Sequence, residues 1–309
     1  MNKYLPEGML LREHTNIEHI SSLKGLERAL EAGIILESPA VLCDHAYNLH
    51  VSLGERIKGI IPRDEVEYNP KEQIKDIAIL TRVGKPVCFK VRGFERKDGE
   101  TIALLSRREA QRECTENYIA GLVPGDILPS KITHLENFGA FVDVGCGIIS
   151  LLSIDSISVS RISHPKERLR VGEFVYTVVK EIDERGRIYV SQRELLGSWM
   201  ENASLFSEGE TVRGIIRSVE DYGIFVELTP NLAGLAEYRA DVFVGQSAAV
   251  YIKSIIPEKM KIKLIIISVH NGDEELSPTE YFIDTKEVTH INSWVYSPPV
   301  SKKTIETIF

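Results

Sequence analysis

The sequence predicts an all-β protein that contains three related β-barrels in tandem, joined by short helical linkers. Two segments repeat at a spacing of 84 residues, NFGAFVDVG from Asn137 and DYGIFVELT from Asp221. Each is flanked by short apolar alternations separated by Gly and Asp turns, a pattern typical of barrel strands. A fainter copy lies upstream, with AYNLHVSLG from Ala46 and VGKPVCFKVRGFE from Val83. Because internal repeats of this kind define the architecture, we expect three similar units.

Composition limits the class of protein. The chain has 309 residues, 43% of them hydrophobic and 27% charged, which favours two or three folded domains over a disordered chain. The longest stretch without Lys, Arg, Asp or Glu is Val288–Ser301, which is too short and too polar to span a bilayer. The first residues lack the apolar core of a secretory signal. We therefore expect a cytoplasmic protein with no membrane partner.

Motifs for catalysis or metal binding are missing from the sequence. The four cysteines, Cys43, Cys88, Cys114 and Cys146, lack CxxC spacing and are expected to be small buried residues. The chain has no HExxH, GxSxG or GxxxxGK[ST] motif. The GCG segment at Gly145–Gly147 is followed by no predicted helix, so it is a poor phosphate cradle. The prediction is a protein that is not an enzyme, with no cofactor and no metal.

The predicted boundaries follow from the repeats. Residues 1–110 form a divergent barrel with an N-terminal extension, 111–122 a helical linker, 123–196 the clearest repeat, 197–206 a second linker, 207–270 a repeat with a shortened loop, and 271–309 an acidic tail. In RREAQRECTENYIA, Ala110, Cys114 and Tyr118 make one apolar stripe of a helix. Trp199 is expected to be a wedge between domains and not a stacking residue. Trp294, Tyr296 and Phe309 are expected to pack against a barrel.

The clearest repeat resembles a known family. GDILPSKITHLENFGAFVDVG from Gly125, followed by VGEFVYTVVKEIDERGRIYVS from Val171, closely resembles the ribosomal S-one (S1) RNA-binding domain. Residues 207–270 match this pattern well at YGIFVEL and NLAGLAE, and residues 33–108 match only in outline. The resemblance implies three tandem OB-fold barrels of five strands, similar to a short member of the bacterial ribosomal S-one proteins. It also implies binding of single-stranded RNA.

The middle repeat holds the best candidate RNA surface. Gly139 can host a bulge that brings the rings of Phe138 and Phe141 to one surface, where they would stack on bases. The alternative is that both rings belong to the core. The resemblance adds Asp183 and Arg187, and it places Ser153 where the family often has a histidine. Candidate phosphate contacts around this surface are Lys131, Arg161, Lys166 and Arg168.

The other two repeats depart from the family pattern. In the third repeat, Tyr222, Phe225, Lys253 and Lys261 are candidate RNA contacts, but Glu237 occupies the position of Ser153 and Pro257 that of Asp183. A carboxylate at that position would repel phosphate, so docking of a protein is an almost equal alternative. In the first repeat, Tyr47 and His50 replace the two rings, Pro62 takes the position of Ser153, and Arg96 and Lys97 lie in a longer hairpin.

Two functions follow as hypotheses. The first is non-enzymatic binding of single-stranded RNA, expected to be messenger RNA, in translation or RNA turnover. The alternative is an adaptor that binds the ribosome or other RNA-associated proteins and has little RNA affinity. The net charge of −8 discourages a nucleic-acid role, but the tail from Asn271 carries three basic and seven acidic residues, which is half of that charge. The barrels are therefore close to neutral, and modest binding led by stacking is expected.

Overall fold

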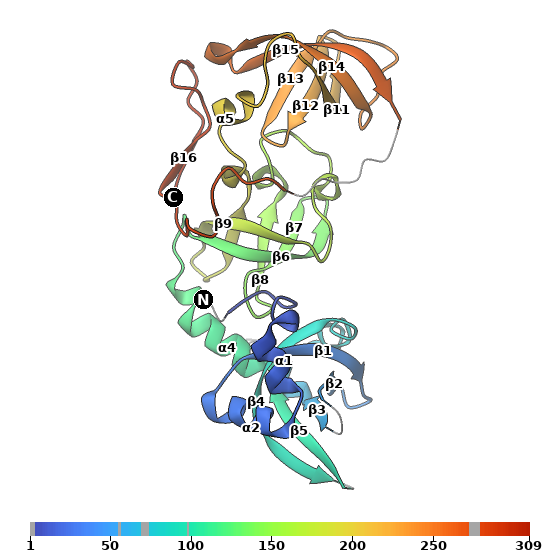
Figure 1. Ribbon diagram of the computed structural model, residues 1–309, viewed down its shortest axis with the longest axis vertical. Coiled ribbons are helices and arrows are strands. Elements are labelled where there is room, and N and C mark those ends of the chain that lie inside the picture. Colours follow the sequence, from blue (N-terminus) through green and yellow to red (C-terminus); the bar gives the residue numbers. More distant parts are fainter. Residues whose placement is uncertain (1–3, 55–56, 69–73, 98, 272–278) are drawn as a thin grey trace. The chain divides into compact units, whose positions relative to one another are not determined.

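The computed structural model describes residues 4–54, 57–68, 74–97, 99–271 and 279–309. Its strands form closed barrels of five strands each, so the predicted β-barrel class is confirmed (Figure 1). The chain divides into two compact units. The first comprises Met1–Leu122 with Pro129–Lys131 and Asp143–Ile149, and the second comprises Val123–Leu128, Ile132–Val142 and Ser150–Phe309.

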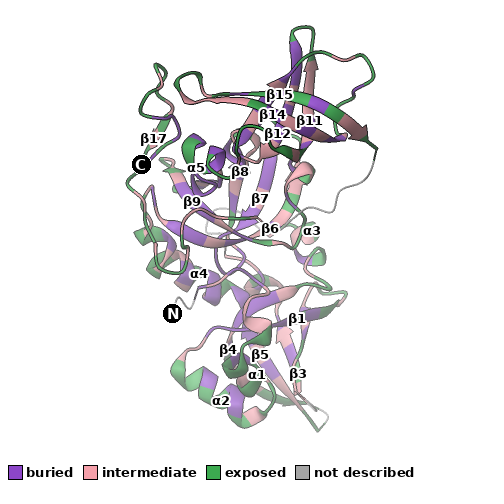
Figure 2. Cartoon of the chain, turned by 45° about the horizontal axis from the view of Figure 1, so that its top comes forward, coloured by how far each residue is buried: buried purple, intermediate pink, exposed green. Residues whose placement is uncertain are grey.

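The first barrel lies in the first unit. Its strands are β1 (Leu36–Cys43), β2 (Leu49–Ser52), β3 (Ile57–Ile61), β4 (Pro86–Lys97) and β5 (Glu100–Ser106). They are joined in the order β1-β2-β3-β5-β4, and β4 closes the barrel on β1. The pair β3 and β5 is parallel, whereas the other pairs are antiparallel. Phe89, Leu49 and Leu105 are fully buried in its core. Figure 2 colours the buried residues of the chain purple.

Helices accompany this barrel, and the first three of them lie in the N-terminal extension. They are η1 (Leu10–Arg12), α1 (His14–Ile20), α2 (Leu23–Ala32), η2 (Arg63–Glu65) and α3 (Asp76–Leu80). The Ser22 side chain accepts the Gly25 amide at the start of α2, and Gly33 ends the helix in the left-handed conformation. Leu26 and Ala29 on α2 are buried in the barrel core. The N-terminal extension is thus part of the folded unit.

A helix begins four residues before the predicted linker at 111–122. Helix α4 (Arg107–Asn117) starts directly after β5, because the Ser106 side chain accepts the Glu109 amide and caps it. The predicted domain boundary at residue 110 therefore falls inside a helix. Ala110 and Cys114 are buried, as the predicted apolar stripe requires. The short helix η3 (Ile119–Gly121) follows α4.

A buried ion cluster in the first unit explains the GCG segment. The fully buried Arg107 donates from Nε to Glu7 Oε1 at 2.6 Å and from Nη2 to Glu7 Oε2 at 3.1 Å. The Glu7 amide donates to Asp143 Oδ2 at 2.7 Å. Burial, together with the Glu7 charge, raises the pKa of Asp143 to about 7. Gly147 has a φ of 77°, and a Cβ there would overlap the Arg107 guanidinium. The glycine is required by packing and not by a phosphate.

Two further sets of five strands follow the first barrel. The middle set is β6 (Ile127–Glu136), β7 (Gly139–Asp143), β8 (Ile149–Ser153), β9 (Phe174–Ile182) and β10 (Ile188–Ser191). The last set is β11 (Thr211–Glu220), β12 (Gly223–Thr229), β13 (Leu232–Ala236), β14 (Ser247–Ile256) and β15 (Lys261–His270). Both repeat the strand order of the first barrel, including a parallel pair between the third and fifth strands. This shared order fits an OB-like fold.

Short helices connect these strands. They are η4 (Ile154–Ser156), η5 (Pro165–Glu167), η6 (Arg193–Leu195), α5 (Trp199–Ala203) and η7 (Pro257–Lys259). Ser198 and Glu201 form a capping box at the start of α5. Trp199 is buried in the core cluster that contains Ile216 and Val226 of the last barrel. Trp199 is therefore not exposed for stacking on bases, and its role as a wedge between domains stays a prediction.

The tail packs on both barrels of the second unit. Trp294 on β16 (Ser293–Val295) and Tyr296 are buried in the core cluster of the last barrel. Phe309, beyond β17 (Glu306–Ile308), is half-buried beside Ile127 and Val178 of the middle barrel. The predicted packing of these three rings is confirmed. Residues 272–278 of the predicted acidic tail lie outside the described residues.

Three of the four cysteines are buried, as expected. Cys88, Cys114 and Cys146 are buried and Cys43 is half-buried, and all four are free thiols. Within the described part of the chain, every helix is too short or too polar to cross a membrane.

Candidate nucleic-acid interface

Two rings of the middle barrel meet on its surface. Phe138 lies just before β7 and is 56% exposed, and Phe141 on β7 is half-buried. Their centroids are 6.1 Å apart and their planes stand at 89°. A Cβ at Gly139 would clash with the carbonyl oxygen of Leu152, so glycine allows β7 and β8 to approach closely here. Phe138 is therefore not a core residue.

His134 on β6 adds a third ring that sequence reasoning missed. Its ring lies 6.4 Å from that of Phe141 at 24°, and its Nε2 is 2.8 Å from Glu136 Oε1. Leu128, Ser130 and Ile132 are buried at alternate positions of β6, so alternation alone predicts an inward His134. The alternation fails at this residue, and no other signal in the sequence marks it.

Asp183 and Arg187 form the turn between β9 and β10. Asp183 Oδ1 accepts the amides of Arg185 and Arg187, and Oδ2 accepts Arg187 Nε at 2.7 Å. The hydrogen bond from the Arg187 amide, helped by the Arg187 side chain, lowers the pKa of Asp183. The Arg187 side chain stays largely exposed. It can therefore present further N–H groups to a phosphate.

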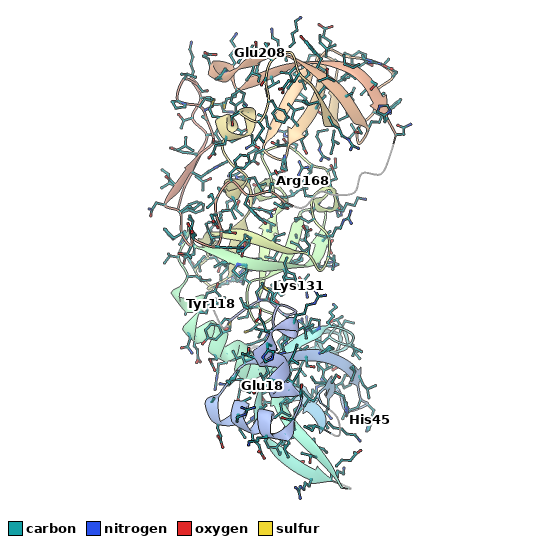
Figure 3. The ribbon with its side chains drawn as sticks, viewed as in Figure 1. Glu18, His45, Tyr118, Lys131, Arg168 and Glu208 are labelled. Atoms are coloured by element: carbon teal, nitrogen blue, oxygen red, sulfur yellow. The ribbon has the colours of Figure 1, made fainter. Side chains whose placement is uncertain are left out.

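Ser153 and Lys131 are engaged with the protein. Ser153 Oγ donates to Ser156 Oγ at 2.9 Å, and a hydrogen bond from the Ser153 side chain lowers the pKa of Asp155. Lys131, labelled in Figure 3, belongs to the first unit, where its Nζ donates to the Glu7 carbonyl at 2.7 Å. A role for either residue in RNA binding stays a prediction.

The prediction of Arg168 as a phosphate contact is wrong. Its Nη1 donates to Glu227 Oε1 at 2.6 Å and its Nη2 also bonds Glu227, and the two side chains are 10% and 4% exposed. A guanidinium bound on both nitrogens by a buried carboxylate is not available to RNA. Arg161 and Lys166 in the same segment are exposed.

The last barrel repeats the ring pair. Tyr222 is 72% exposed, and its ring lies 6.2 Å from that of Phe225 at 86°. A Cβ at Gly223 would clash with the Ala236 carbonyl oxygen, just as a Cβ at Gly139 would clash with a carbonyl oxygen in the middle barrel. The candidates Lys253 and Lys261 are exposed, and so is Glu237. Pro257 begins η7.

Strand register adds Lys263 to this surface. Phe225 pairs with Leu235, which in turn pairs with Lys263 on β15. Paired residues of adjacent strands point to the same face of a sheet. The exposed Lys263 therefore shares a row with Phe225. Because this pairing is parallel and non-local, the sequence pattern does not indicate Lys263.

In the first barrel, the side chains at the corresponding positions contact other residues of the same barrel. Tyr47 packs against the barrel core, and the Arg63 guanidinium lies 4.8 Å from its ring centroid. His50 Nε2 is 3.3 Å from Asp44 Oδ2. Hydrogen bonds from the Asn48 backbone and side chain and from His50 lower the pKa of Asp44 to about 2. Pro62 precedes η2, and Arg96 and Lys97 are exposed at the end of β4.

Candidate metal ligands do not gather in the described ranges, where no group of three or more His, Cys, Asp or Glu residues could hold an ion. The site geometry is thus that of a surface with rings and cations on a closed five-stranded barrel. This combination fits a barrel of the OB class, a class that includes proteins that bind single-stranded nucleic acids.

Comparison with known proteins identifies the middle barrel more closely. Residues 123–193 match the S1 RNA binding domain family, so this part of the chain is an S1 domain. The resemblance of the sequence to this family is confirmed.

The curated relatives are ribosomal proteins. The chain is 30% identical over 181 residues to small ribosomal subunit protein bS1 of Rhodopseudomonas palustris, covering 57% of this chain and 31% of that protein. It is 27% identical over 237 residues to the bS1 protein of Rhizobium meliloti, covering 68% and 40%. It is 29% identical over 237 residues to the bS1 homolog of Bacillus cereus, covering 74% and 58%. The chain thus spans less than two thirds of each relative.

Among solved structures, the chain is similar to a multidomain protein with nucleic acid binding domains from Streptococcus pneumoniae. The two are 14% identical, with 76% of this chain and 73% of that chain covered and a TM-score of 0.25. A score this low supports no argument about function.

Proposed function

We propose that the protein binds single-stranded RNA in the cytoplasm without catalysing a reaction, and that it acts in translation or RNA turnover. Messenger RNA is the proposed ligand. The observation that supports the proposal best is the exposed ring pair Phe138 and Phe141 on an S1 domain, repeated as Tyr222 and Phe225. The relatives named for the small ribosomal subunit favour a role beside the ribosome.

Stacking supplies most of the proposed affinity. Each base that stacks on an exposed ring contributes about 1–3 kcal/mol, without readout of sequence. His134 would extend the surface beside Phe141. The proposed phosphate contacts are Arg187 in the S1 domain and Lys261 and Lys263 in the last barrel.

We further propose that the chain holds three S1-type barrels, of which the last two bind RNA. Each site is weak, and linkage raises the effective concentration of the strand at the second site. The first barrel is proposed to contact a protein, because Arg63 covers Tyr47 and Asp44 holds His50. Its partner would be the ribosome or another RNA-associated protein.

A titration tests this function. Labelled single-stranded RNA, single-stranded DNA and duplex RNA are titrated with the full chain at about 50 mM and 200 mM salt. We expect the single strands to bind more tightly than the duplex, with a modest loss of affinity at the higher salt, because stacking needs unpaired bases. Equal affinity for the duplex and the single strands would overturn the proposal.

The alternative is an adaptor with little RNA affinity of its own. Two observations support it. In the first barrel, Tyr47 and His50 are held by Arg63 and Asp44. In the last barrel, the carboxylate of Glu237 is exposed. Pull-down from a lysate before and after nuclease treatment separates the two functions. Partners that persist without RNA, combined with no binding in the titration, would favour the adaptor.

A further inference from the structure

We propose that Arg168 and Glu227 lock the S1 domain to the last barrel, so that their two ring pairs bind one RNA strand as a single surface. This inference rests on the proposed function and names how its two sites are coupled. Arg168 projects from the segment between β8 and β9, in the part of the second unit where the S1 domain meets the last barrel (Figure 3).

The centre of the lock is a buried carboxylate. Glu227 lies on β12, two residues after Phe225, and is 5% exposed. Arg168 reaches it from the S1 domain with both terminal nitrogens. Arg217 on β11 donates from Nε to Glu227 Oε2 at 2.7 Å and from Nη2 to Oε1 at 3.2 Å. The carboxylate is fully occupied by two guanidinium groups.

A second ion pair crosses the same boundary. Arg217 Nη1 donates to Glu167 Oε2 of the S1 domain, and the Arg217 side chain is buried. Each barrel thus contributes one acid and one arginine to the network. Buried arginine–carboxylate pairs hold a defined geometry, because the planar fork fixes the orientation of both groups.

The turn after β12 adds uncharged contacts. Asn231 is buried, and its Oδ1 accepts the Val159 amide at 3.0 Å. Its Nδ2 donates to the carbonyls of Arg193 at 2.7 Å and Gly197 at 2.9 Å. The Tyr296 hydroxyl donates to the Asn231 carbonyl at 2.7 Å. One turn of the last barrel is therefore held by the S1 domain, the linker and the tail.

These contacts lie close along the chain to the ring pair of the last barrel. Strand β12 carries Phe225 and then Glu227, and it ends at the turn that holds Asn231. Residues at i and i+2 of a strand point to one face, so Glu227 continues the outer row of Phe225. In the S1 domain, β8 ends at Ser153, and the segment after it contains Val159 and Arg168.

A fixed relation between two weak sites changes how RNA binds. A strand held on one ring pair meets the second pair at a high effective concentration, provided that the barrels keep a productive orientation. Loosening the lock lowers the affinity for RNA that reaches both pairs and leaves the affinity for RNA that reaches only one. A lost phosphate contact would instead weaken both.

The test compares two RNA lengths on one variant. Arg168→Met removes the guanidinium that the S1 domain contributes and keeps the Arg217–Glu227 pair inside the last barrel. Oligouridines of about 6 and about 24 nucleotides serve as ligands, since one OB fold covers roughly 4–16 nucleotides. Arg170→Met is the matched control, because it removes the same charge from an exposed position two residues away.

We expect Arg168→Met to weaken binding of the long oligomer at least about fivefold and that of the short one by less than about twofold. Arg170→Met should leave the ratio of the two affinities unchanged. An equal loss for both lengths, or no loss for the long oligomer, would overturn the proposal.

Two further measurements keep the test decisive. If Arg168→Met does not fold, Glu167→Gln replaces it, because it keeps an oxygen for the Ser163 and His164 amides and weakens only the Arg217 pair. X-ray scattering without RNA should show a broader distribution of dimensions for the variant than for the wild type. If the wild type binds neither oligomer, the proposed function fails, and unchanged scattering of the variant would overturn the lock separately.

Discussion

The ring of Tyr222 stands at 86° to the ring of Phe225, with their centroids 6.2 Å apart. The pair Phe138 and Phe141 has nearly the same geometry in the S1 domain, 84 residues earlier in the chain. In both barrels a glycine between the rings allows close approach of the next strand. The two repeats therefore share the same ring geometry.

The last barrel should contribute to RNA binding through its rings. Tyr222→Ala with Phe225→Ala should weaken binding of a long single-stranded RNA about fivefold, near the lower end of the free energy of stacking. Fluorescence anisotropy with a labelled oligomer measures this. An unchanged affinity with an intact fold would assign this barrel to protein docking.

Glu237 should oppose RNA binding. It is exposed and directly follows Ala236, which pairs with Ile224 between the two ring residues. A carboxylate there repels phosphate. Glu237→Gln should raise RNA affinity about twofold at low salt, with a smaller gain at high salt because exposed charges are screened. The control is Glu31→Gln at an exposed position of α2 in the first unit, and it should leave RNA affinity unchanged. A gain of equal size for the control would show an effect of net charge alone.

Trp199 should act on stability and not on RNA contact. The side chain is buried in the core of the last barrel, so Trp199→Ala should lower the free energy of unfolding by about 3–5 kcal/mol. Urea unfolding followed by circular dichroism measures the loss. A variant of unchanged stability that binds RNA much more weakly would show that Trp199 stacks on bases instead.

Asp44 should make the first unit sensitive to acid. Hydrogen bonds from Asn48 and His50 hold its folded pKa near 2, below the ordinary value of 3.8. A carboxyl with a lowered pKa stabilises the fold above its ordinary pKa, and this stabilisation is lost as the pH falls toward 2. Wild type should therefore lose stability more steeply than Asp44→Asn between pH 4 and 2 in urea titrations. Parallel curves would contradict the assigned pKa.

Much of the fold was predictable because barrel strands leave a local signal. The period-two alternation around NFGAFVDVG and DYGIFVELT, with Gly turns, places β7 and β12 directly. Helix α2 carries local signals of its own, the Ser22 cap and the Gly33 stop. Helix α4 begins at Arg107, before the predicted boundary at residue 110, because Ser106 caps it at the last residue of β5.

The site was predictable only where its residues are close in sequence. Phe138 and Phe141 are three residues apart, and the glycine between them suggested their shared surface. Arg168 was wrongly predicted as a phosphate contact because its partner, Glu227, lies 59 residues away. Lys263 joins the site through strand pairing, and His134 joins it through a break in the alternation of β6. The sequence shows neither of these features.

The most direct test of the account is an anisotropy titration of Phe138→Ala with Phe141→Ala against a labelled single-stranded RNA. Phe243→Ala is the control, because it removes an exposed ring outside both pairs. The account predicts that the double variant keeps its fold and loses RNA affinity at least about tenfold, while the control binds as the wild type does. An unchanged titration of the folded double variant would contradict the claim that this ring pair binds RNA.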